Sequence, residues 1–280
     1  MYTFTKQADL KRHLHTFHTN QTIGFVPTMG ALHEGHLALM KQSLKDNSVT
    51  VVSIFVNPTQ FNNILDLEKY PRTLEKDTIK IQSISTGIII FAPTVADMYE
   101  NEVVSESFDF DGLEHQMEGK HRPGHFDGVG TVVKKLFGIV SPTHAYFGEK
   151  DFQQLQIIKK MVEKHHLNVK VVGCPIFREN NGLAMSSRNE RLSANDKSSA
   201  KIIFETLITA KKMFGTNSAK EVLQFVENVF KDIENFKLEY FEIACEDTLL
   251  PCAIKSNSKN CRAFIAIFVG DVRLIDTILF

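Results

Sequence analysis

Two histidines, His33 and His36, stand three residues apart in FVPTMGALHEGHLALM, the segment over residues 25–40. An apolar run precedes them and apolar residues at helical spacing follow, so the pair is predicted at a helix N-terminus. Such a terminus offers free N–H groups and a positive dipole end to a phosphate. Gly30 permits a tight turn, and two imidazoles one helical turn apart can face one ligand. For this segment alone, phosphate binding and simple capping are equally good interpretations.

A zinc site is a weaker interpretation of the same pair. Zinc-binding helices usually place their histidines four residues apart with a glutamate between them. Here the separation is three, and the four cysteines of the chain include no CxxC pair. The sequence therefore predicts no metal ligands.

Two later segments could supply further donors to a phosphate. GEKD (148–151) follows a predicted strand, and Lys150 within it could bring a compact positive charge. MSSRN (185–189) offers Ser186, Ser187 and Arg188 in succession. Taken alone, the first segment is more typical of a solvated turn, and the second of a polar loop that caps a helix.

Three neutral amides, Asn57, Gln60 and Gln154, lie near the ends of predicted strands. Surface amides are common, so each of them alone is weak support for a site. Their neutrality would matter in a substrate site, because an amide orients a carboxylate without cancelling the charge that makes it a nucleophile.

The segment EGKHRPGHFDG (118–128) holds His121, Arg122 and His125 among three glycines. So much glycine is unusual inside a helix or strand, and we therefore predict a structured loop. This segment could contact phosphate, substrate or another subunit, and the sequence does not decide among these three roles.

Alternating strands and helices must position these residues. The pattern predicts buried strands followed by helices, the signature of an α/β, Rossmann-like doubly wound parallel sheet. Ligands of such sheets sit beyond the carboxyl ends of the strands. Three polar segments, TMGALHEGH (28–36), NPTQF (57–61) and GEKDFQQ (148–154), follow predicted strands and are expected to line that edge. Pro27 and Pro58 are predicted to end the first two strands. The expected strands are 21–26, 49–56, 87–93, 145–148 and 169–175, and the expected helices are 36–46, 131–140 and 152–165.

The pattern changes after about residue 176. Two helical stretches are followed by three strand-like ones, which predicts a smaller C-terminal α+β domain over 177–280 beside a catalytic domain over 1–176. NGLAMSSRN (181–189) lies near this junction, and clefts between domains are common ligand sites. The expected helices are 195–214 and 218–235, and the expected strands are 238–244, 261–269 and 272–280.

The overall composition excludes several classes of protein. With 43% hydrophobic and 23% charged residues the chain is ordinary globular material. A formal net charge of −1 gives no electrostatic case for nucleic acid. The longest apolar run, 263–269, falls short of the ~20 residues that a membrane helix needs. The N-terminus does not resemble a signal peptide, and cysteines without pairing motifs suggest reduced thiols, so we expect a cytoplasmic protein.

With these motifs in order, the chain resembles the pantothenate synthetase family, the pantoate–β-alanine ligases of coenzyme A biosynthesis. The resemblance runs over nearly the whole chain, and a chance match of so many ordered motifs is not credible. The motifs are PTMGALHEGH (27–36), SIFVNPTQF (53–61), YPRT (70–73), EGKHRPGHFDGV (118–129), FGEKD (147–151), QQL (153–155), NGLAMSSRN (181–189) and RLIDTIL (273–279).

The resemblance implies a nucleotidylyltransferase fold and a two-step reaction. The pantoate carboxylate attacks the α-phosphate of ATP, which gives pantoyl adenylate and pyrophosphate. The amine of β-alanine then displaces AMP to form pantothenate. Mg²⁺ is expected with the ATP, and a homodimer is expected from the family.

Carried over by motif, the resemblance also implies the roles of single residues. His36 is the family's proposed proton donor, and His33, Lys150 and Arg188 join it at the phosphates. Gln60, Gln154 and Asn57 would contact pantoate or β-alanine. The ATP contacts implied are Met29, Gly30, Ala31, Leu32, His33, Glu34, Gly35, His36, Gly148, Glu149, Lys150, Asp151, Phe177, Met185, Ser186, Ser187 and Arg188.

The sequence also shows two departures from the family pattern and leaves two rival functions open. Phe177 replaces a smaller aliphatic residue, and Asn62 and Asn63 stand where a glycine is common. Another adenylyltransferase on the same scaffold, or a nucleotide-binding protein without turnover, would share the HEGH and MSSRN segments.

Overall fold

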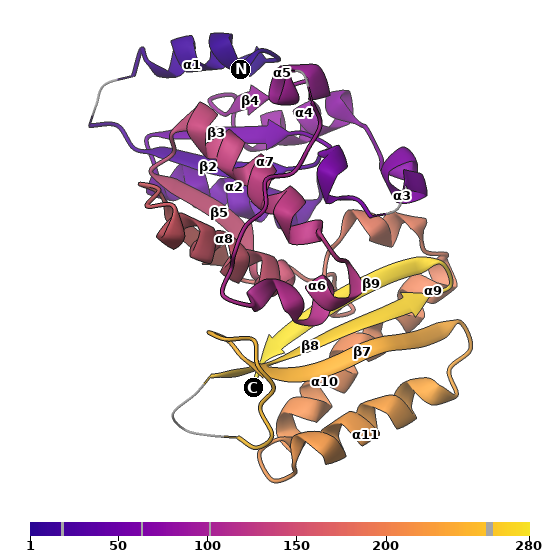
Figure 1. The fold of residues 1–280 in the computed structure, drawn as a ribbon. Coiled ribbons are helices and arrows are strands. Elements are labelled where there is room, and N and C mark those ends of the chain that lie inside the picture. Colours follow the sequence, from indigo (N-terminus) through magenta and orange to yellow (C-terminus); the bar gives the residue numbers. More distant parts are fainter. Residues whose placement is uncertain (18–19, 63, 101, 256–259) are drawn as a thin grey trace. The chain divides into compact units, whose positions relative to one another are not determined.

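The computed structural model describes residues 1–17, 20–62, 64–100, 102–255 and 260–280 (Figure 1). The chain divides into two compact units. The first unit comprises residues 1–114, 119–148 and 154–174, and the second comprises 115–118, 149–153 and 175–280. Two short segments from the N-terminal half of the chain therefore belong to the second unit.

The first unit is built on a six-stranded parallel sheet, as the sequence predicts. Its strand order is β1-β4-β3-β2-β5-β6. The chain moves outward from β2 to β3 and β4, then returns to β5 on the other side of β2, so the strand order reverses between β2 and β5. The strands are β1 (Thr3–Phe4), β2 (Ile23–Thr28), β3 (Val49–Ile54), β4 (Ile89–Phe91), β5 (His144–Gly148) and β6 (Lys170–Cys174).

Helices cover both faces of this sheet because its strands carry apolar side chains on both sides. Val26 and Val52 pack in one core with Met40 of α2 and Ile81 of α4. On the opposite face the ring of Phe25 lies 6.2 Å from that of Phe137 in α7. The helices are α1 (Gln7–Leu14), α2 (Glu34–Asp46), α3 (Ile64–Lys69), α4 (Leu74–Ile84), α5 (Val95–Tyr99), α7 (His125–Val140) and α8 (Phe152–Lys164), with short turns η1 (Pro58–Gln60) and η2 (Leu113–His115).

The structure corrects the prediction that Pro27 ends the first strand. β2 continues to Thr28, and Pro27 pairs in register with Ser53 of β3. The pairing with β5 involves only Gly24 and Phe25. The carbonyl of Thr28 accepts from Phe55 on the β3 side, so the nitrogen of Pro27 faces the β5 side, where no ladder is interrupted.

The glycine-rich segment 118–128 is also not a loop throughout. Helix α6 (Met117–His121) occupies its start, and α7 begins at His125 rather than near residue 131. Gly124 separates the two helices with a φ of +77°, a left-handed conformation that glycine adopts without strain. The glycines therefore mark a helix junction instead of an extended loop.

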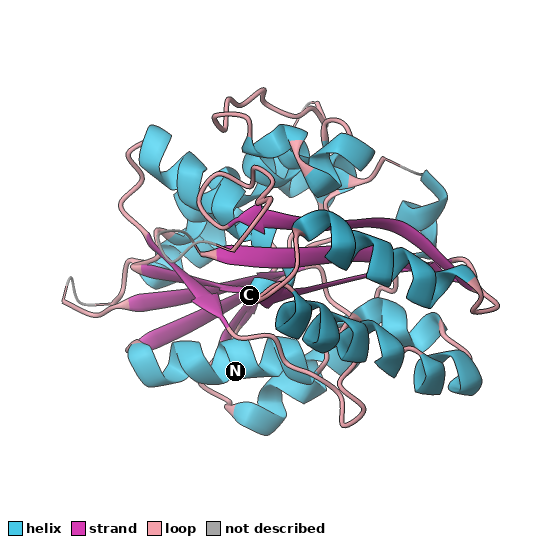
Figure 2. Cartoon of the chain, turned by 90° about the horizontal axis from the view of Figure 1, so that it is seen from below, coloured by secondary structure: helices cyan, strands magenta, loops and turns pink. Residues whose placement is uncertain are grey.

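The second unit holds an antiparallel sheet in the order β7-β8-β9 (Figure 1). Figure 2 shows the strands of the chain in magenta and the helices in cyan. Its inward side chains, among them Ile243 and Ile265, form one core with Leu207 of α10 and Val226 of α11. The predicted helix over 195–214 is broken at Ala200. The elements are η3 (Glu149–Asp151), η4 (Ser187–Arg191), α9 (Ala194–Ser199), α10 (Lys201–Met213), α11 (Ala219–Lys231), β7 (Phe236–Cys245), β8 (Cys261–Val269) and β9 (Val272–Leu279).

The helices of both units are short or amphipathic. Among the residues that the structure describes, no helix combines the length and the apolar character needed to span a bilayer.

Candidate active site

The loop after β2 lies at the point where the strand order of the parallel sheet reverses. In a doubly wound sheet this point opens a crevice beyond the carboxyl ends of the flanking strands. Residues 29–33 leave β2 there, and Gly148 ends the neighbouring strand β5 at the same edge. The sequence prediction that these segments share one edge of the sheet is thus confirmed for the first unit.

A buried carboxylate fixes the conformation of the loop after β2. Asp77 of α4 accepts from the backbone N–H groups of Ala31 (3.0 Å) and Leu32 (2.7 Å). Gly30 has a φ of +84°, and a Cβ there would meet Asp77 Oδ2 at 3.1 Å, so only glycine fits without strain. The backbone N–H groups of Ala31 and Leu32, both predicted ATP contacts, thus bond Asp77 and shape the loop.

His33 and His36 lie against each other at the start of α2. Their rings stack at 4.0 Å between centroids with 26° between planes. The backbone N–H of His33 donates to Nδ1 of His36 at 3.4 Å. Since Nδ1 accepts, a neutral His36 carries its proton on Nε2, which makes that atom a hydrogen-bond donor.

The neutral amides after β3 join two hydroxyl side chains in a network, the amide cluster, which consists of Asn57, Thr59, Gln60 and Tyr99. Asn57 and Tyr99 are buried, and Thr59 and Gln60 are half-buried. Asn57 is 1% exposed, and its Nδ2 lies 3.3 Å from Gln60 Oε1. Gln60 Nε2 in turn lies 2.8 Å from Sδ of Met29 in the loop after β2. The candidate substrate amide and the candidate ATP loop are thus in contact.

Residues at and just before the start of α7 hold this cluster through the backbone of Gln60. His125 Nδ1 donates to the Gln60 carbonyl at 2.9 Å, and Arg122 donates to the same oxygen at 3.3 Å. A Cβ on Gly128 would lie 2.3 Å from the carbonyl oxygen of Thr59. The three roles left open for the segment 118–128 stay predictions, but its histidine, arginine and glycine all shape η1.

Two adjacent glutamines at the start of α8 differ in their surroundings. Gln153 is 3% exposed; it donates to the carbonyl of Gln116 at 2.8 Å and accepts from the N–H of Glu118 at 2.9 Å. Gln154, the residue that the family match selects, is half-buried and lies in the first unit. The structure thus gives Gln153 a structural task, and the substrate role of Gln154 stays a prediction.

In the second unit, η3 presents Lys150 and Asp151. Lys150 Nζ lies 3.8 Å from Asp151 Oδ1, with side chains 16% and 50% exposed. Arg262 of β8 holds the residues on either side of this pair, since it bonds Glu149 at 3.3 Å and lies 4.0 Å from the centroid of the Phe152 ring.

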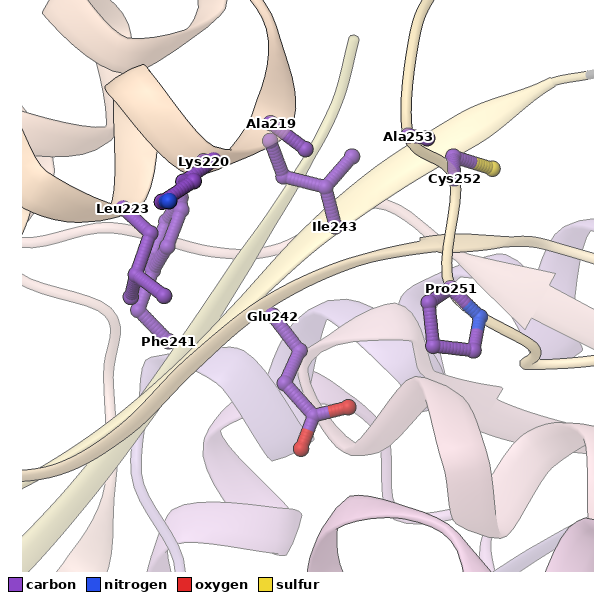
Figure 3. Close-up of a pocket in the computed structure, with 9 residues that line it drawn as sticks. All are labelled: Ala219, Lys220, Leu223, Phe241, Glu242, Ile243, Pro251, Cys252 and Ala253. Atoms are coloured by element: carbon purple, nitrogen blue, oxygen red, sulfur yellow. The ribbon is translucent and has the colours of Figure 1, made fainter.

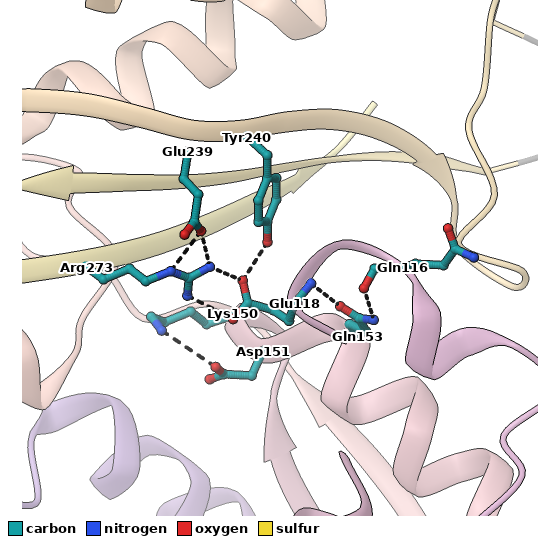
Figure 4. A network of polar contacts seen from close by, with 8 residues as sticks. All are labelled: Gln116, Glu118, Lys150, Asp151, Gln153, Glu239, Tyr240 and Arg273. Atoms are coloured by element: carbon teal, nitrogen blue, oxygen red, sulfur yellow. Dashed lines mark hydrogen bonds and ion pairs between the residues drawn. The ribbon is translucent and has the colours of Figure 1, made fainter. Parts of the chain in front are cut away.

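A second polar group, the ionic cluster, is partly buried and consists of Glu118, Glu239, Tyr240 and Arg273 (Figure 4). Arg273 makes two bonds to Glu118, of 2.9 and 2.7 Å, and the Tyr240 hydroxyl donates to Glu118 at 2.6 Å. Burial opposes the charge of Arg273, but Glu118 and Glu239 outweigh it and raise its pKa. Burial, reinforced by the charge of Glu118, also raises the pKa of Tyr240.

The segment 177–189 forms a pinned turn in the second unit. Met185 donates to the carbonyl of Phe177 at 3.0 Å, and Arg178 bonds Asp276 of β9 through both carboxylate oxygens, at 2.6 and 2.9 Å. Ser186 caps η4 by accepting from the N–H of Arg188 at 3.3 Å. Of the two interpretations of MSSRN, capping of a helical turn is thus present for Ser186, and the ATP contacts of residues 185–188 stay a prediction.

Phe177 and Asn62, two departures from the family pattern, can both be located. The Phe177 side chain is 42% exposed, so its size meets no obstacle within the second unit. Asn62 donates to the carbonyl of Pro123 at 2.7 Å. Asn63 lies outside the described residues.

The second unit also contains a cavity of about 380 Å³ (Figure 3). It is lined by one side of α11, by residues 241–243 of β7 and by residues 251–253, and its walls are mainly apolar. None of the residues predicted from sequence to bind ATP, pantoate or β-alanine lines this cavity.

Sequence reasoning missed several residues that hold the site residues in place. Asp77, Tyr99 and Arg262 are 45, 42 and 113 positions away from partners that they bond. Aspartate in a helix or tyrosine at a helix end carries no local signal of such a task. Two family motifs gave the nearest signal of such residues. YPRT (70–73) ends shortly before Asp77, and RLIDTIL (273–279) contains Arg273 and Asp276.

Comparison with known proteins gives matches over the full chain. The family model described as pantoate-beta-alanine ligase matches residues 2–279. A pantothenate synthetase of Flavobacterium psychrophilum is 63% identical over 99% of both chains, and one of Christiangramia forsetii is 55% identical over 92% of this chain and 91% of its own.

Solved structures agree with these matches. The crystal structure of pantothenate synthetase from Thermus thermophilus has a TM-score of 0.91 at 38% identity and covers 99% of both chains. A pantoate-beta-alanine ligase from Francisella tularensis, complexed with beta-gamma ATP and beta-alanine, has a TM-score of 0.83 at 36% identity. It covers 100% of this chain and 97% of its own.

Proposed function

This chain belongs to the pantoate–β-alanine ligase family, and from that premise we propose that it joins pantoate to β-alanine, using ATP, to give pantothenate, AMP and pyrophosphate. The observation that carries the proposal is the contact between Gln60 of the amide cluster and Met29 of the loop after β2. One residue matches the family's pantoate site and the other its ATP loop, so the carboxylate and the α-phosphate would meet there.

In the first step the pantoate carboxylate attacks the α-phosphate of ATP and pyrophosphate leaves. Negative charge grows on the phosphoryl oxygens and on the leaving group, so donors and cations fixed in advance lower the barrier. His36, through Nε2, is proposed to donate to the phosphates beside His33. Lys150, Ser186, Ser187 and Arg188 are proposed to bring further donors from the second unit.

In the second step the amine of β-alanine attacks the acyl carbon of pantoyl adenylate and AMP leaves. Gln60 and Gln154 are proposed to orient pantoate in both steps. Asn57, which the sequence also suggested as a substrate contact, is 1% exposed and bonds Gly128 and Tyr99, so it is proposed to act through Gln60. All three side chains are neutral, which leaves the carboxylate its full nucleophilic charge in the first step. A basic residue in their place would hold the substrate more tightly and weaken it as a nucleophile.

Further parts of the proposal follow from the family. We propose that residues 177–280 form a domain that closes over the site on 1–176, that the protein is a cytoplasmic homodimer, and that Mg²⁺ accompanies ATP. Mg²⁺ is expected to be held through phosphate oxygens. Across the described ranges, no three His, Cys, Asp or Glu side chains gather where they could hold an ion.

The proposal is tested by ATP–pyrophosphate exchange with pantoate present and β-alanine absent. Exchange that depends on pantoate would establish a reversible adenylate. No exchange, with full turnover once β-alanine is added, would point to ordered or concerted chemistry by the same ligase. Silence under both conditions would contradict the proposal and favour an adenylyltransferase with another acceptor or a protein that only binds nucleotide.

A further inference from the structure

Tyr99 is a buried tyrosine that no motif of the site includes. It ends α5, and its side chain is 6% exposed. Phe55 packs 6.5 Å from its ring, between centroids, and Lys135 Nζ lies 5.4 Å from the ring centroid. The ring is thus held in place, and its hydroxyl reaches Asn57 Oδ1 at 2.5 Å.

The bonds around Asn57 allow only one orientation of its amide. Nδ2 lies 3.1 Å from the carbonyl oxygen of Gly128. A carbonyl can only accept, so the NH₂ group must be on that side and Oδ1 must face Tyr99. The Tyr99 hydroxyl is therefore the donor in its bond to Asn57.

The orientation of the Asn57 amide also determines the orientation of the Gln60 amide. The NH₂ group of Asn57 also lies 3.3 Å from Gln60 Oε1, so this oxygen accepts and the NH₂ group of Gln60 points the other way. There it meets Met29 Sδ at 2.8 Å. A thioether is a weak acceptor, and a carboxylate or hydroxyl oxygen of a substrate would replace it favourably.

We propose that Tyr99 is a positioning residue for the hydroxy-acid substrate, because through Asn57 it fixes Gln60 with its NH₂ group toward that substrate. This inference rests on the proposed function for the identity of the substrate, pantoate. Burial raises the pKa of the Tyr99 hydroxyl, so it stays protonated and remains a donor through the neutral range.

The test is Tyr99→Phe, with Tyr146→Phe as its matched control. Tyr146 is fully buried in the first unit, and its hydroxyl also bonds an asparagine, accepting from Asn47 Nδ2 at 2.7 Å. Both variants lose one buried hydroxyl, so a general loss of stability would affect both. In Tyr99→Phe, Asn57 Oδ1 loses the nearer of its donors and keeps Thr59 Oγ1 at 3.2 Å. We expect the pantoate KM of ATP–pyrophosphate exchange to rise about tenfold with the ATP KM unchanged, the size expected when a buried acceptor loses a good donor.

Two kinetic results would overturn the proposal. One is an unchanged pantoate KM in Tyr99→Phe, and the other is an equal rise of the pantoate and ATP KM values. A pantoate KM that rises as much in Tyr146→Phe would overturn it as well, because the effect would then be general.

A second readout does not depend on the reaction. The side-chain NH₂ signals of Asn57 and Gln60 in nitrogen-15 NMR spectra, assigned with Asn57→Asp and Gln60→Glu, report the bonds of each amide. We expect both signals to shift in Tyr99→Phe and to stay in Tyr146→Phe. An unmoved Gln60 signal contradicts the positioning role. A shifted Gln60 signal in a protein that shows neither pantoate-dependent exchange nor turnover with β-alanine supports the positioning role and contradicts the proposed function alone.

Discussion

The amide cluster of the first unit and the ionic cluster of the second are both organised around a buried tyrosine hydroxyl. Tyr99 donates to the neutral oxygen of Asn57 at 2.5 Å, and Tyr240 donates to the carboxylate of Glu118 at 2.6 Å. The first cluster contains no formal charge. The second contains two carboxylates and one guanidinium.

This difference matches two different tasks. A neutral network can present an amide to a substrate without altering the substrate's charge. A charged network binds its members strongly but leaves a severe penalty if one partner is lost. The ionic cluster ties the segment 115–118 to the strands β7 and β9 of the second unit. We therefore expect the ionic cluster to govern stability and the amide cluster to govern substrate binding.

The largest effect is expected from Arg273→Met, which breaks the ionic cluster. Glu118 and Glu239 would remain with side chains only 12% and 21% exposed and without their cation. Removal of one partner from a buried ion pair costs about 3–5 kcal/mol of unfolding free energy. Denaturant unfolding measures this loss.

Arg191→Met provides the comparison for that prediction. Arg191 pairs with Asp271 at 2.8 Å, but the side chain of Asp271 is 80% exposed. Solvent screens such a pair, so the expected loss is about 0–1 kcal/mol. Equal losses of unfolding free energy in Arg273→Met and Arg191→Met would contradict the prediction that the ionic cluster stabilises the protein more than an exposed ion pair does.

His36→Ala should separate rate from stability in the first unit. It removes one donor proposed to face the phosphates, and loss of such a donor costs about 2.7–4 kcal/mol of transition-state stabilisation, roughly 10²–10³ in rate. Single-turnover formation of the adenylate measures the effect, and the exposed His15→Ala serves as control. An unchanged rate would exclude this role for His36.

Gly128→Ala should distort the amide cluster by steric contact alone. The new Cβ would lie 2.3 Å from the carbonyl oxygen of Thr59 and 2.8 Å from the Cα of Gln60. Such overpacking costs about 1–3 kcal/mol of unfolding free energy, and the shift of η1 should also raise the pantoate KM.

The control for that change lies in the same helix. A Cβ on Gly138 would meet nothing within 4 Å, so Gly138→Ala should stabilise α7 by about 0.5–1 kcal/mol. Opposite signs in the two variants would support the close approach of α7 and η1. A gain of stability in both would contradict it.

The last test is the titration of Tyr146. Burial raises its pKa from 10.0 to about 12, so the folded state holds this proton more tightly than the unfolded state. The stabilisation is fully present below pH 10 and is lost as the pH rises through about 12. Unfolding free energies measured over this window should fall with pH, and the fall should be shallower in Tyr146→Phe.

The sequence predicted the family and the fold class, and both predictions are confirmed. The buried strands could be predicted because runs that are mostly β-branched, such as Val49–Ile54, are typical of parallel strands buried on both faces. Pro27 and the start of α7 were predicted wrongly. Rules based on the local sequence do not show that the nitrogen of Pro27 faces an unpaired side of its strand. Nor do they show that the glycines at the start of α7 lie where the helix passes close to η1.

The candidate ATP and substrate residues stay predictions at the level of single contacts. The sequence located Asn57 and Gln60 through a motif, but the motif did not show that Asn57 is turned inward toward Tyr99. Asp77 was missed for the same reason as Tyr99, because a bond across 45 positions leaves no periodic trace in the chain. Motifs predict the groups that would touch a ligand better than the groups that hold them.

The short strand β1 has a practical consequence for handling the protein. The carbonyls of Tyr2 and Phe4 accept from Ile90 and Ala92 and so cover the outer edge of β4. Truncation of the first four residues would expose a strand, Ile89–Phe91, that carries no charge. Uncovered edges of this kind join to one another and aggregate. A purification tag at the N-terminus should therefore be added before residue 1 and should not replace residues 1–4.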